Sequence, residues 1–323
     1  MVTVSRDMLV DIVGQVSQPA LKQWLKISEL PRTATNTDEF YELLKRNIER
    51  GILSLEALRE AVLEIEENGG KRIYLRKIEV PARLKNRADF VSHLHDLHLS
   101  LSENITASIQ MPPNPIINYI VWTPQGLRIK ATETNIDLEL DYESRSFIEK
   151  KVTKYLIALV DFNSGFVQIR LDPPGMLHSH KNSDDKSDPR VYENFYFEWF
   201  KNIIGVDELN RYDINGVAEK IVNTQPRIFR LPTELVRTGA NSKQRYSCRL
   251  DVRDDPARQA AAQADSQNWV YEYLRGYWIP EQSNGLLQRE LYMELRRDIS
   301  MVHFLADCLS DEVDYALSRI RTL

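Results

Sequence analysis

The chain has 323 residues, of which 42% are hydrophobic and 28% are charged. This composition excludes a largely disordered chain, and the length suffices for two or more domains with apolar cores of their own. The net charge of -5 at pH 7 excludes a molecule that is basic over its whole surface. Electrostatic binding of nucleic acid, if it occurs, must therefore be confined to one region.

The sequence also disfavours membrane insertion and thiolate chemistry. Its longest apolar runs, YLIALV and IINYIVW, are far shorter than the ~20 residues of a spanning helix. The N-terminal segment has early acidic residues and lacks the pattern of a signal peptide. Cys248 and Cys308 have no Cys-x-x-Cys partner, and we expect both to be buried, reduced side chains. These features predict a soluble, cytoplasmic protein with no cofactor and no membrane partner.

Residues 1–70 are expected to form a small helical bundle. Asn36 and Glu39 have the spacing of a capping box at the start of one helix. Ser54 can cap the next helix, which Gly69–Gly70 is expected to end. The first seventy residues are therefore predicted to be a domain of their own.

A sheet region is predicted over 71–172, because the hydrophobic period changes from helical to alternating in KRIYLRKI. The apolar spacing from Phe90 to Leu101 predicts a helix. Further strands are expected for ITASIQ, NYIVWTP, GLRIKATE and NIDLELDY. After a short helical piece, YLIALVDFNSGFVQIRLD is typical of a hairpin with Asn163–Gly165 in its turn.

The polar stretch 173–190 contains three prolines and predicts a loop. A second α+β region is expected over 191–323. Its helices are predicted for VYENFYFEWFKNII, DINGVAEKIV and ARQAAAQADSQN, and its strands for RYSCRLDVRD, NWVYEYLRGYW and LLQRELYMELRR. A closing helix has its apolar face between Leu309 and Ile320. The predicted fold class is α+β: a small N-terminal helical bundle, then a mixed, largely antiparallel sheet domain with a C-terminal helix.

Three of the six histidines lie in DFVSHLHDLHLSL and raise the question of a metal site. On a helix, His93 and His95 would point about 200° apart, whereas His95 and His98 would lie one turn apart and could supply two ligands. Two ligands do not complete a site, and nothing in the sequence brings His178 or His180 to this helix. We therefore expect no bound metal.

An acidic alternation places Asp137, Glu139 and Asp141 on one face of a predicted strand, a geometry suited to Mg²⁺ in phosphoryl chemistry. Asp161 on a neighbouring strand would extend it into a nuclease-like centre. The Glu-x-Lys part of the common nuclease pattern is missing after Asp161, where FVQIR stands. Nucleophile-elbow, P-loop and dinucleotide motifs are missing as well. A solvated strand face is the simpler interpretation, and a metal-dependent nuclease is the alternative.

The strongest functional signal is basic. Between residues 71 and 87, seven residues are Lys or Arg and only Glu79 is acidic. On a strand, Arg72, Tyr74 and Arg76 would project from one face while the residues between them enter the core. Guanidinium groups beside an aromatic ring suit phosphates, stacked bases or an acidic protein surface. A plain solvated sheet edge, protected from aggregation by its charge, is the other interpretation.

A second basic cluster lies between residues 227 and 253, where seven cations stand against Glu234 and Asp251. These cations are Arg227, Arg230, Arg237, Lys243, Arg245, Arg249 and Arg253. The two segments together give the predicted binding residues, which are Lys71, Arg72, Tyr74, Arg76, Lys77, Arg83, Lys85, Arg87, Arg245 and Arg249.

The first 140 residues or so are expected to run from a helical bundle to the basic strand KRIYLRKI, the helix DFVSHLHDLHLSL and the strands ITASIQ and NYIVW. This order of elements resembles that of the centromere protein N and Chl4 type. That resemblance implies a pyrin-like helical domain ahead of a mixed sheet, and nucleosomal DNA bound through basic residues of both regions. No single residue is assigned a role by it.

The sequence thus favours a non-enzymatic nucleic-acid-binding or adaptor protein, a subunit of a larger complex that uses the basic segment 71–87. The expected partners are nucleic acid or an acidic protein surface, together with other protein subunits. Two alternatives remain: a metal-dependent nuclease that uses the acidic strand 137–141, and an interaction subunit that binds no nucleic acid.

Overall fold

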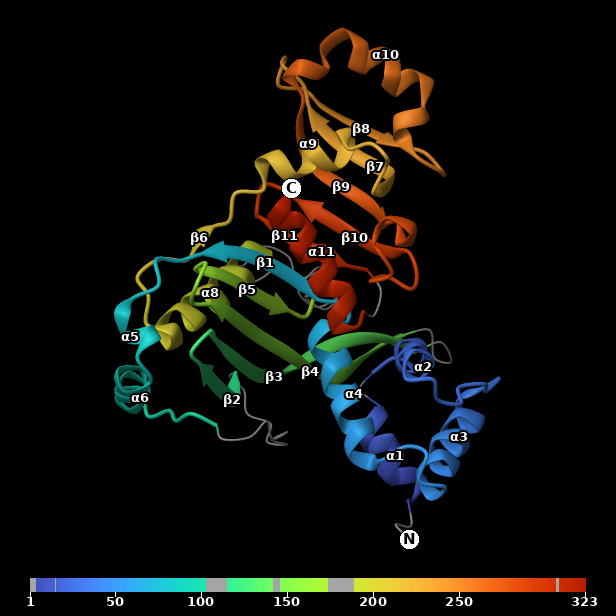
Figure 1. Cartoon of the computed structure of the whole chain (residues 1–323), viewed down its shortest axis with the longest axis vertical. Helices are drawn as coiled ribbons and strands as arrows, with labels where there is room; N and C mark the ends of the chain where they lie inside the picture. The colour runs from blue at the N-terminus through green and yellow to red at the C-terminus, as the bar shows by residue number, and fades with distance from the viewer. Residues whose placement is uncertain (1–3, 15, 103–114, 142–145, 174–188, 306–307) are drawn as a thin grey trace. The chain divides into compact units, whose positions relative to one another are not determined.

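The computed structural model describes residues 4–14, 16–102, 115–141, 146–173, 189–305 and 308–323. It confirms the α+β class, with N-terminal helices, antiparallel strand pairing and a C-terminal helix (Figure 1). The chain divides into two compact units. Unit 1 comprises Met1–Gly70, Asn215–Leu295 and His303–Leu323, and unit 2 comprises Lys71–Ile214 and Arg296–Val302. Residues 1–70 therefore belong to the same unit as two later segments.

Unit 1 begins with the helices α1 (Arg6–Val13), α2 (Gln18–Ile27), α3 (Thr37–Glu49) and α4 (Leu55–Asn68). Two of them start at the predicted caps. The side chain of Asn36 accepts a hydrogen bond from the Glu39 N–H at 2.8 Å, and that of Ser54 accepts one from the Ala57 N–H at 3.0 Å. The Glu39 carboxylate accepts from the Thr35 N–H, so it reaches back one residue further than the predicted capping box requires.

The C-terminal helix α11 (Ser310–Thr322) packs against these N-terminal helices. The apolar face predicted for it is buried. Leu309, directly before the helix, belongs to the apolar core of the N-terminal helices. The N–H and the hydroxyl of Ser310 donate to the Glu64 carboxylate on α4 at 3.0 and 2.6 Å. The start of the C-terminal helix thus joins the core and the α4 surface of the N-terminal helices.

The rest of unit 1 is a sheet with helices. Its strands are β7 (Phe229–Arg237), β8 (Lys243–Ser247), β9 (Val270–Trp278) and β10 (Leu291–Arg296), in the order β10-β9-β7-β8. Its helices are α9 (Asn215–Asn223), α10 (Pro256–Asp265) and the single turns Val252–Asp254, Ser266–Asn268 and Pro280–Gln282. The strand β11 (Met301–Phe304) begins in unit 2 and ends in unit 1.

The two faces of this sheet differ. Along β9, Leu274 and Trp278 are buried, whereas Tyr273, Arg275 and Tyr277 alternate with them and are half-exposed. The helices α9 and α11 lie on the buried face (Figure 1). The half-exposed side chains therefore belong to an open face of the sheet.

Unit 2 contains the remaining strands of the sheet, together with helices. Its strands are β1 (Arg72–Lys77), β2 (Ile116–Thr123), β3 (Gly126–Asp141), β4 (Ser146–Asp161), β5 (Phe166–Leu171) and β6 (Asn210–Arg211). Their order is β2-β3-β4-β5-β1, and β6 also pairs with β1. Its helices are α5 (Ala82–Lys85), α6 (Arg87–Asp96) and α8 (Pro189–Ile204). Among the described helices of both units, none combines the length and hydropathy that a membrane span requires.

Several predictions for residues 71–190 need correction. GLRIKATE and NIDLELDY form one strand, β3, and the short helical piece predicted before Tyr155 is wrong, because β4 pairs with β3 from Ser146 onward. The hairpin of β4 and β5 is confirmed, with Gly165 at a φ of 66° in its turn. ITASIQ and most of the predicted loop 173–190 lie outside the described residues.

Candidate nucleic-acid interface

The basic strand predicted to face solvent is buried on both sides. Tyr74 and Arg76 are 0% and 4% exposed, and the neighbouring Lys71 is 2% exposed and paired with Asp172. The prediction that this face of the strand is available to a partner is therefore wrong for Tyr74 and Arg76, whereas Arg72 is partly exposed. The physical reason is that β1 pairs with β5 and β6 and that α8 covers the Tyr74 side, where the phenol donates to the Glu193 carboxylate.

Arg72 also turns toward α8. Its side chain is 26% exposed and lies 3.9 Å from Glu193 Oε1. The four remaining cations of the segment are exposed on β1, α5 and α6. They are Lys77, Arg83, Lys85 and Arg87. Of these, Arg83 donates to the carbonyl of Gly205. The segment 71–87 thus supplies a few separate surface charges rather than a basic strand face.

Glu193 is a buried acid whose titration can be tested. Burial is the main reason that its pKa lies above the ordinary 4.5 in the folded protein. The folded state then binds a proton more readily than the unfolded state. This contribution to stability is therefore complete below pH 4.5 and lost as the pH rises through the folded pKa.

Glu193→Gln is expected to leave the protein at least as stable at neutral pH, because the neutral amide still accepts the Tyr74 hydrogen bond. The variant should also lack the decline in stability above pH 4.5 that the wild type shows. Urea unfolding at several pH values measures both effects, with Glu198→Gln at an exposed position of the same helix as the control. A variant that is less stable than the wild type at neutral pH would contradict this prediction.

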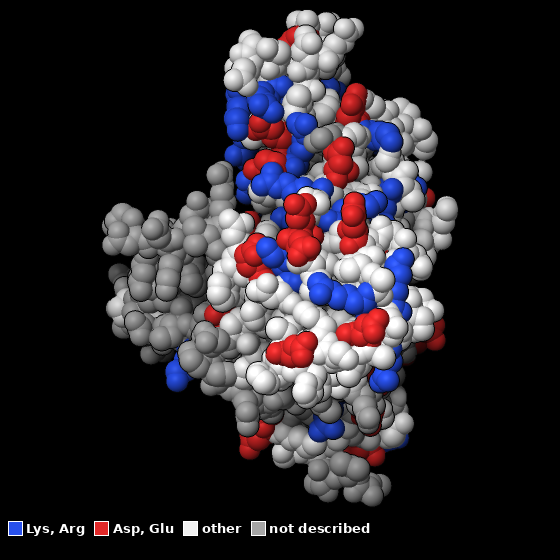
Figure 2. All heavy atoms as spheres, turned by 90° about the vertical axis from the view of Figure 1, so that its left-hand side faces the viewer, with Lys and Arg blue, Asp and Glu red and all other residues white. Residues whose placement is uncertain are grey.

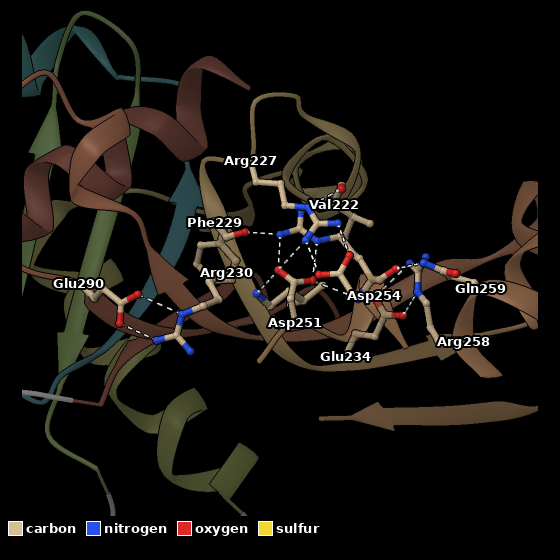
Figure 3. A network of polar contacts seen from close by, with 12 residues as sticks. Val222, Arg227, Phe229, Arg230, Glu234, Asp251, Asp254, Arg258, Gln259 and Glu290 are labelled. Carbon is tan, nitrogen blue, oxygen red and sulfur yellow. Dashed lines mark hydrogen bonds and ion pairs between the residues drawn. The ribbon is translucent and has the colours of Figure 1, made fainter. Parts of the chain in front are cut away.

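Most of the second basic cluster is neutralised by carboxylates (Figure 3). Arg227 makes two hydrogen bonds of 2.7 Å to Asp254. The Nε of Arg230 donates to Glu290 at 3.0 Å, and that of Arg258 donates to Glu234 at 2.8 Å. Further pairs join Arg237 and Lys243 to Glu272 and Arg253 to Asp251. These pairs reduce the net charge that the cluster offers to a partner, and only the pairs of Arg253 and Arg258 are buried.

Asp251 is the centre of this network. Its carboxylate accepts from Arg253 Nε and Nη2 at 2.8 and 2.6 Å and from the Leu231 N–H at 3.1 Å. Arg253 also donates to the carbonyls of Val222 and Phe229. Burial opposes ionisation of Asp251, but these hydrogen bonds outweigh it and hold the pKa of Asp251 below its ordinary value. The ion pair ties α9 and β7 to the turn at Val252–Asp254.

Arg245 and Arg249 are the two members of that cluster left without an ion pair in the part of the chain that the structure describes. Both are exposed, on and just after β8, the outermost strand of the unit 1 sheet. Arg245 lies opposite Leu235, which lies opposite Tyr273. Because directly opposed residues on antiparallel strands share a face, Arg245 belongs to the open face.

Four side chains on that open face form a stack, which we call the stacking face. The rings of Tyr277 and Tyr292 are parallel within 17°, with centroids 4.3 Å apart. The guanidinium of Arg230 lies 4.0 Å from the Tyr277 ring centroid, and that of Arg275 lies 5.1 Å from the Tyr292 centroid. All four side chains are half-exposed. Two aromatic rings, each between the other ring and a guanidinium, thus lie half-exposed on one sheet surface.

Sequence inspection missed the stacking face, although part of its signal was present. Tyr273, Arg275 and Tyr277 recur with period two in VYEYLRGYW, which marks one face of a strand. Their partner Tyr292 lies on β10, and only the pairing of the strands reveals it. The exposed residues of 71–87 belong to unit 2, whereas the stacking face belongs to unit 1.

The acidic strand stays a prediction. Asp137, Glu139 and Asp141 lie on β3, opposite Lys150, Ile148 and Ser146 of β4 in the backbone register. Their side chains lie outside the described residues, as do His178 and His180.

The histidine helix is shorter than predicted. The helix α6 ends at Asp96, and His98 follows it at a φ of 58°. His98 thus lies outside the helix, although its N–H donates to the His95 carbonyl at 2.9 Å. Within the described residues, no group of three or more His, Cys, Asp or Glu side chains could hold a metal ion.

No protein-family model matches this chain, and no curated protein matches it either. The resemblance to the centromere protein N and Chl4 type therefore stays a prediction.

Figure 2 shows one face of the molecule, on which Lys and Arg side chains are interspersed with Asp and Glu and form no continuous basic area among the described residues. A partner of that face would therefore have to be recognised by local contacts rather than by a broad field.

Proposed function

We propose that the protein binds single-stranded nucleic acid through the stacking face, without catalysing a reaction. The observation that supports this most is the half-exposed pair of stacked tyrosines between two guanidinium groups. Bases stack on aromatic rings whatever their sequence, and arginine adds cation–π contacts and phosphate contacts. An open sheet face can present several rings to successive bases of an unpaired strand.

The charges on this face favour an anionic partner. Cations from β7, β8 and β9 outnumber the carboxylates with which some of them pair. The cations are Arg230, Arg237, Lys243, Arg245 and Arg275, and the carboxylates are Glu272, Glu290 and Glu294. Arg245 and Arg249 are both exposed and can contact phosphates, whose contacts position a strand without reading its sequence.

Tyr277→Ala and Tyr292→Ala are each expected to weaken binding of a labelled single-stranded oligonucleotide by about 1–3 kcal/mol, the contribution of one stacked base. Fluorescence anisotropy measures the affinity. Tyr41→Ala is the matched control. Tyr41 is also half-exposed and also lies beside an arginine, Arg6, but it belongs to the helix α3 and not to the stacking face. Equal affinities for the wild type and both stacking-face variants would overturn the proposal.

Charge reversals locate the phosphate contacts in the same assay. Arg245→Glu and Arg249→Glu should each lower the salt dependence of binding, by about one unit of the logarithmic slope for each phosphate that the variant no longer neutralises. Lys85→Glu and Arg87→Glu, at exposed positions of unit 2, serve as controls. If only the second pair weakens binding, the segment 71–87 is the interface and the stacking face is not.

The adaptor role and the location are part of the proposal. A tyrosine and arginine surface also suits a protein partner, so a wild type that binds no nucleic acid at low salt would favour an interaction subunit. We place the protein in the cytoplasm, where the half-exposed Cys248 and the buried Cys308 would stay reduced.

A further inference from the structure

Unit 2 contains a groove of about 870 Å³ beside the buried end of β1. Its walls come from α8, from the segment 207–211 and from the turn at Asp298 and Ile299. This volume is typical of sites for small molecules. The groove is separate from the stacking face, which belongs to unit 1.

Arg76 lies in this groove and is a buried cation with no carboxylate at ion-pair distance among the described residues, although the nearby Glu193 carboxylate favours its charge. It is 4% exposed, and its Nη1 donates to the carbonyls of Leu75 and Ile299 at 2.9 and 3.1 Å. Its guanidinium lies 4.4 Å from the ring centroid of Phe197. Burial is the main cause that lowers the pKa of Arg76 to about 10, so the side chain is still charged at neutral pH.

A second arginine lies directly opposite. Arg211 on β6 is the register partner of Arg76 on β1, so both side chains project from the same face. Its Nη1 donates to the carbonyl of Asp298 at 2.6 Å. Like charges at opposed positions repel each other, and the proximity of Arg211 also contributes to the lowered pKa of Arg76. In each guanidinium, Nη1 is held by backbone carbonyls, and the remaining N–H groups can donate to a ligand.

Four of the five acids that line the groove are engaged elsewhere, and the fifth, Asp207, is exposed. Glu193 accepts from Tyr74, Glu198 pairs with Lys201 at 2.5 Å, and Asp298 pairs with Arg296 at 3.4 Å. Glu208 accepts from the side chain of Asn210 at 3.2 Å. No carboxylate in the described part of unit 2 forms an ion pair with Arg76 or Arg211. Arg211 is exposed, but Arg76 is buried, and a buried charge is costly unless a counter-charge is present. A ligand can supply that counter-charge.

We propose that Arg76 and Arg211 bind the oxyanion of a small-molecule ligand, a phosphate or a carboxylate, whose remainder occupies the groove against Phe197. Two guanidinium forks with fixed edges suit either anion, since both accept paired N–H donors. The site lies in unit 2 and uses no residue of the stacking face. A test of anion binding is therefore independent of a test of nucleic-acid binding.

Calorimetric titration of the full chain with inorganic phosphate and, separately, with acetate tests this site at constant ionic strength. We expect saturable millimolar binding of at least one ion, and the ion preferred identifies the ligand group. Arg211→Ala should weaken that binding about tenfold or more, as expected when a hydrogen bond to a charged group is removed. Arg87→Ala, at an exposed position outside the groove, is the matched control.

Arg76→Lys complements this test, because it keeps the charge and removes the fork. It should bind the preferred ion more weakly than the wild type while circular dichroism shows an unchanged fold. Absence of saturable binding by either ion, or equal binding by the wild type and Arg211→Ala, would overturn the proposal.

Discussion

Replacing Asp251 by alanine is expected to lower the free energy of unfolding by about 3–5 kcal/mol, the cost of removing one partner from a buried ion pair. The side chains of Arg253 and Asp251 are only 6% and 8% exposed. Without the carboxylate, Arg253 keeps only carbonyl partners, and the Leu231 N–H on β7 loses its acceptor. Urea unfolding measures the loss.

Arg227→Ala is the matched control for this prediction. Its pair with Asp254 belongs to the same network but is solvated, with side chains 34% and 61% exposed. Exposed pairs contribute about 0–1 kcal/mol, so this variant should be nearly as stable as the wild type. If both substitutions cost the same, the network stabilises the protein through its total charge rather than through the buried pair.

Trp278→Ala is expected to lower the free energy of unfolding of unit 1 by about 3–5 kcal/mol, as large-to-small substitutions in a packed core do. The indole is 0% exposed. It packs edge-to-face against Phe229 and Tyr315, with centroid distances of 5.2 and 6.0 Å, and its N–H points to the sulfur of Met293 at 3.0 Å. The substitution therefore leaves a cavity between β9, β7 and α11.

Trp278→Phe provides the comparison, because it keeps an aromatic ring in the core and should cost less than the alanine variant. Trp278 follows Tyr277 on β9 but faces the opposite side of the sheet. Oligonucleotide affinity of the folded phenylalanine variant should therefore equal that of the wild type. A loss below about 1 kcal/mol for Trp278→Ala would show that this core is far looser than its burial implies.

Helices and hairpins were predictable because their signals are local. Asn36 and Ser54 mark helix starts by their own side chains, and Gly165 marks a turn by its positive φ. The strand β7 was missed because Pro232 lies inside it. The structure accommodates this proline at a register shift between Arg230 and Thr233, where the strand ladder is interrupted.

The candidate site was harder to predict because its contacts connect distant parts of the chain. Arg230 meets Glu290, sixty residues later, so counting charges within a segment overstates how basic that segment is. The burial of Arg76 has the same origin, since no local pattern shows that α8 covers β1. The two-residue repeat of side-chain direction predicts which residues share a face of a strand. It does not predict whether another element covers that face.

The joining of α4 to the residues around Leu309 has a consequence for synthesis on the ribosome. The N-terminal helices leave the ribosome first, but part of their apolar core is translated roughly 240 residues later. At about 5–20 residues per second, this interval lasts tens of seconds or less, and nascent chains with uncovered apolar surface are prone to aggregate. Chaperones that shield newly made chains therefore have their natural target in the first seventy residues, until the last helix has been translated.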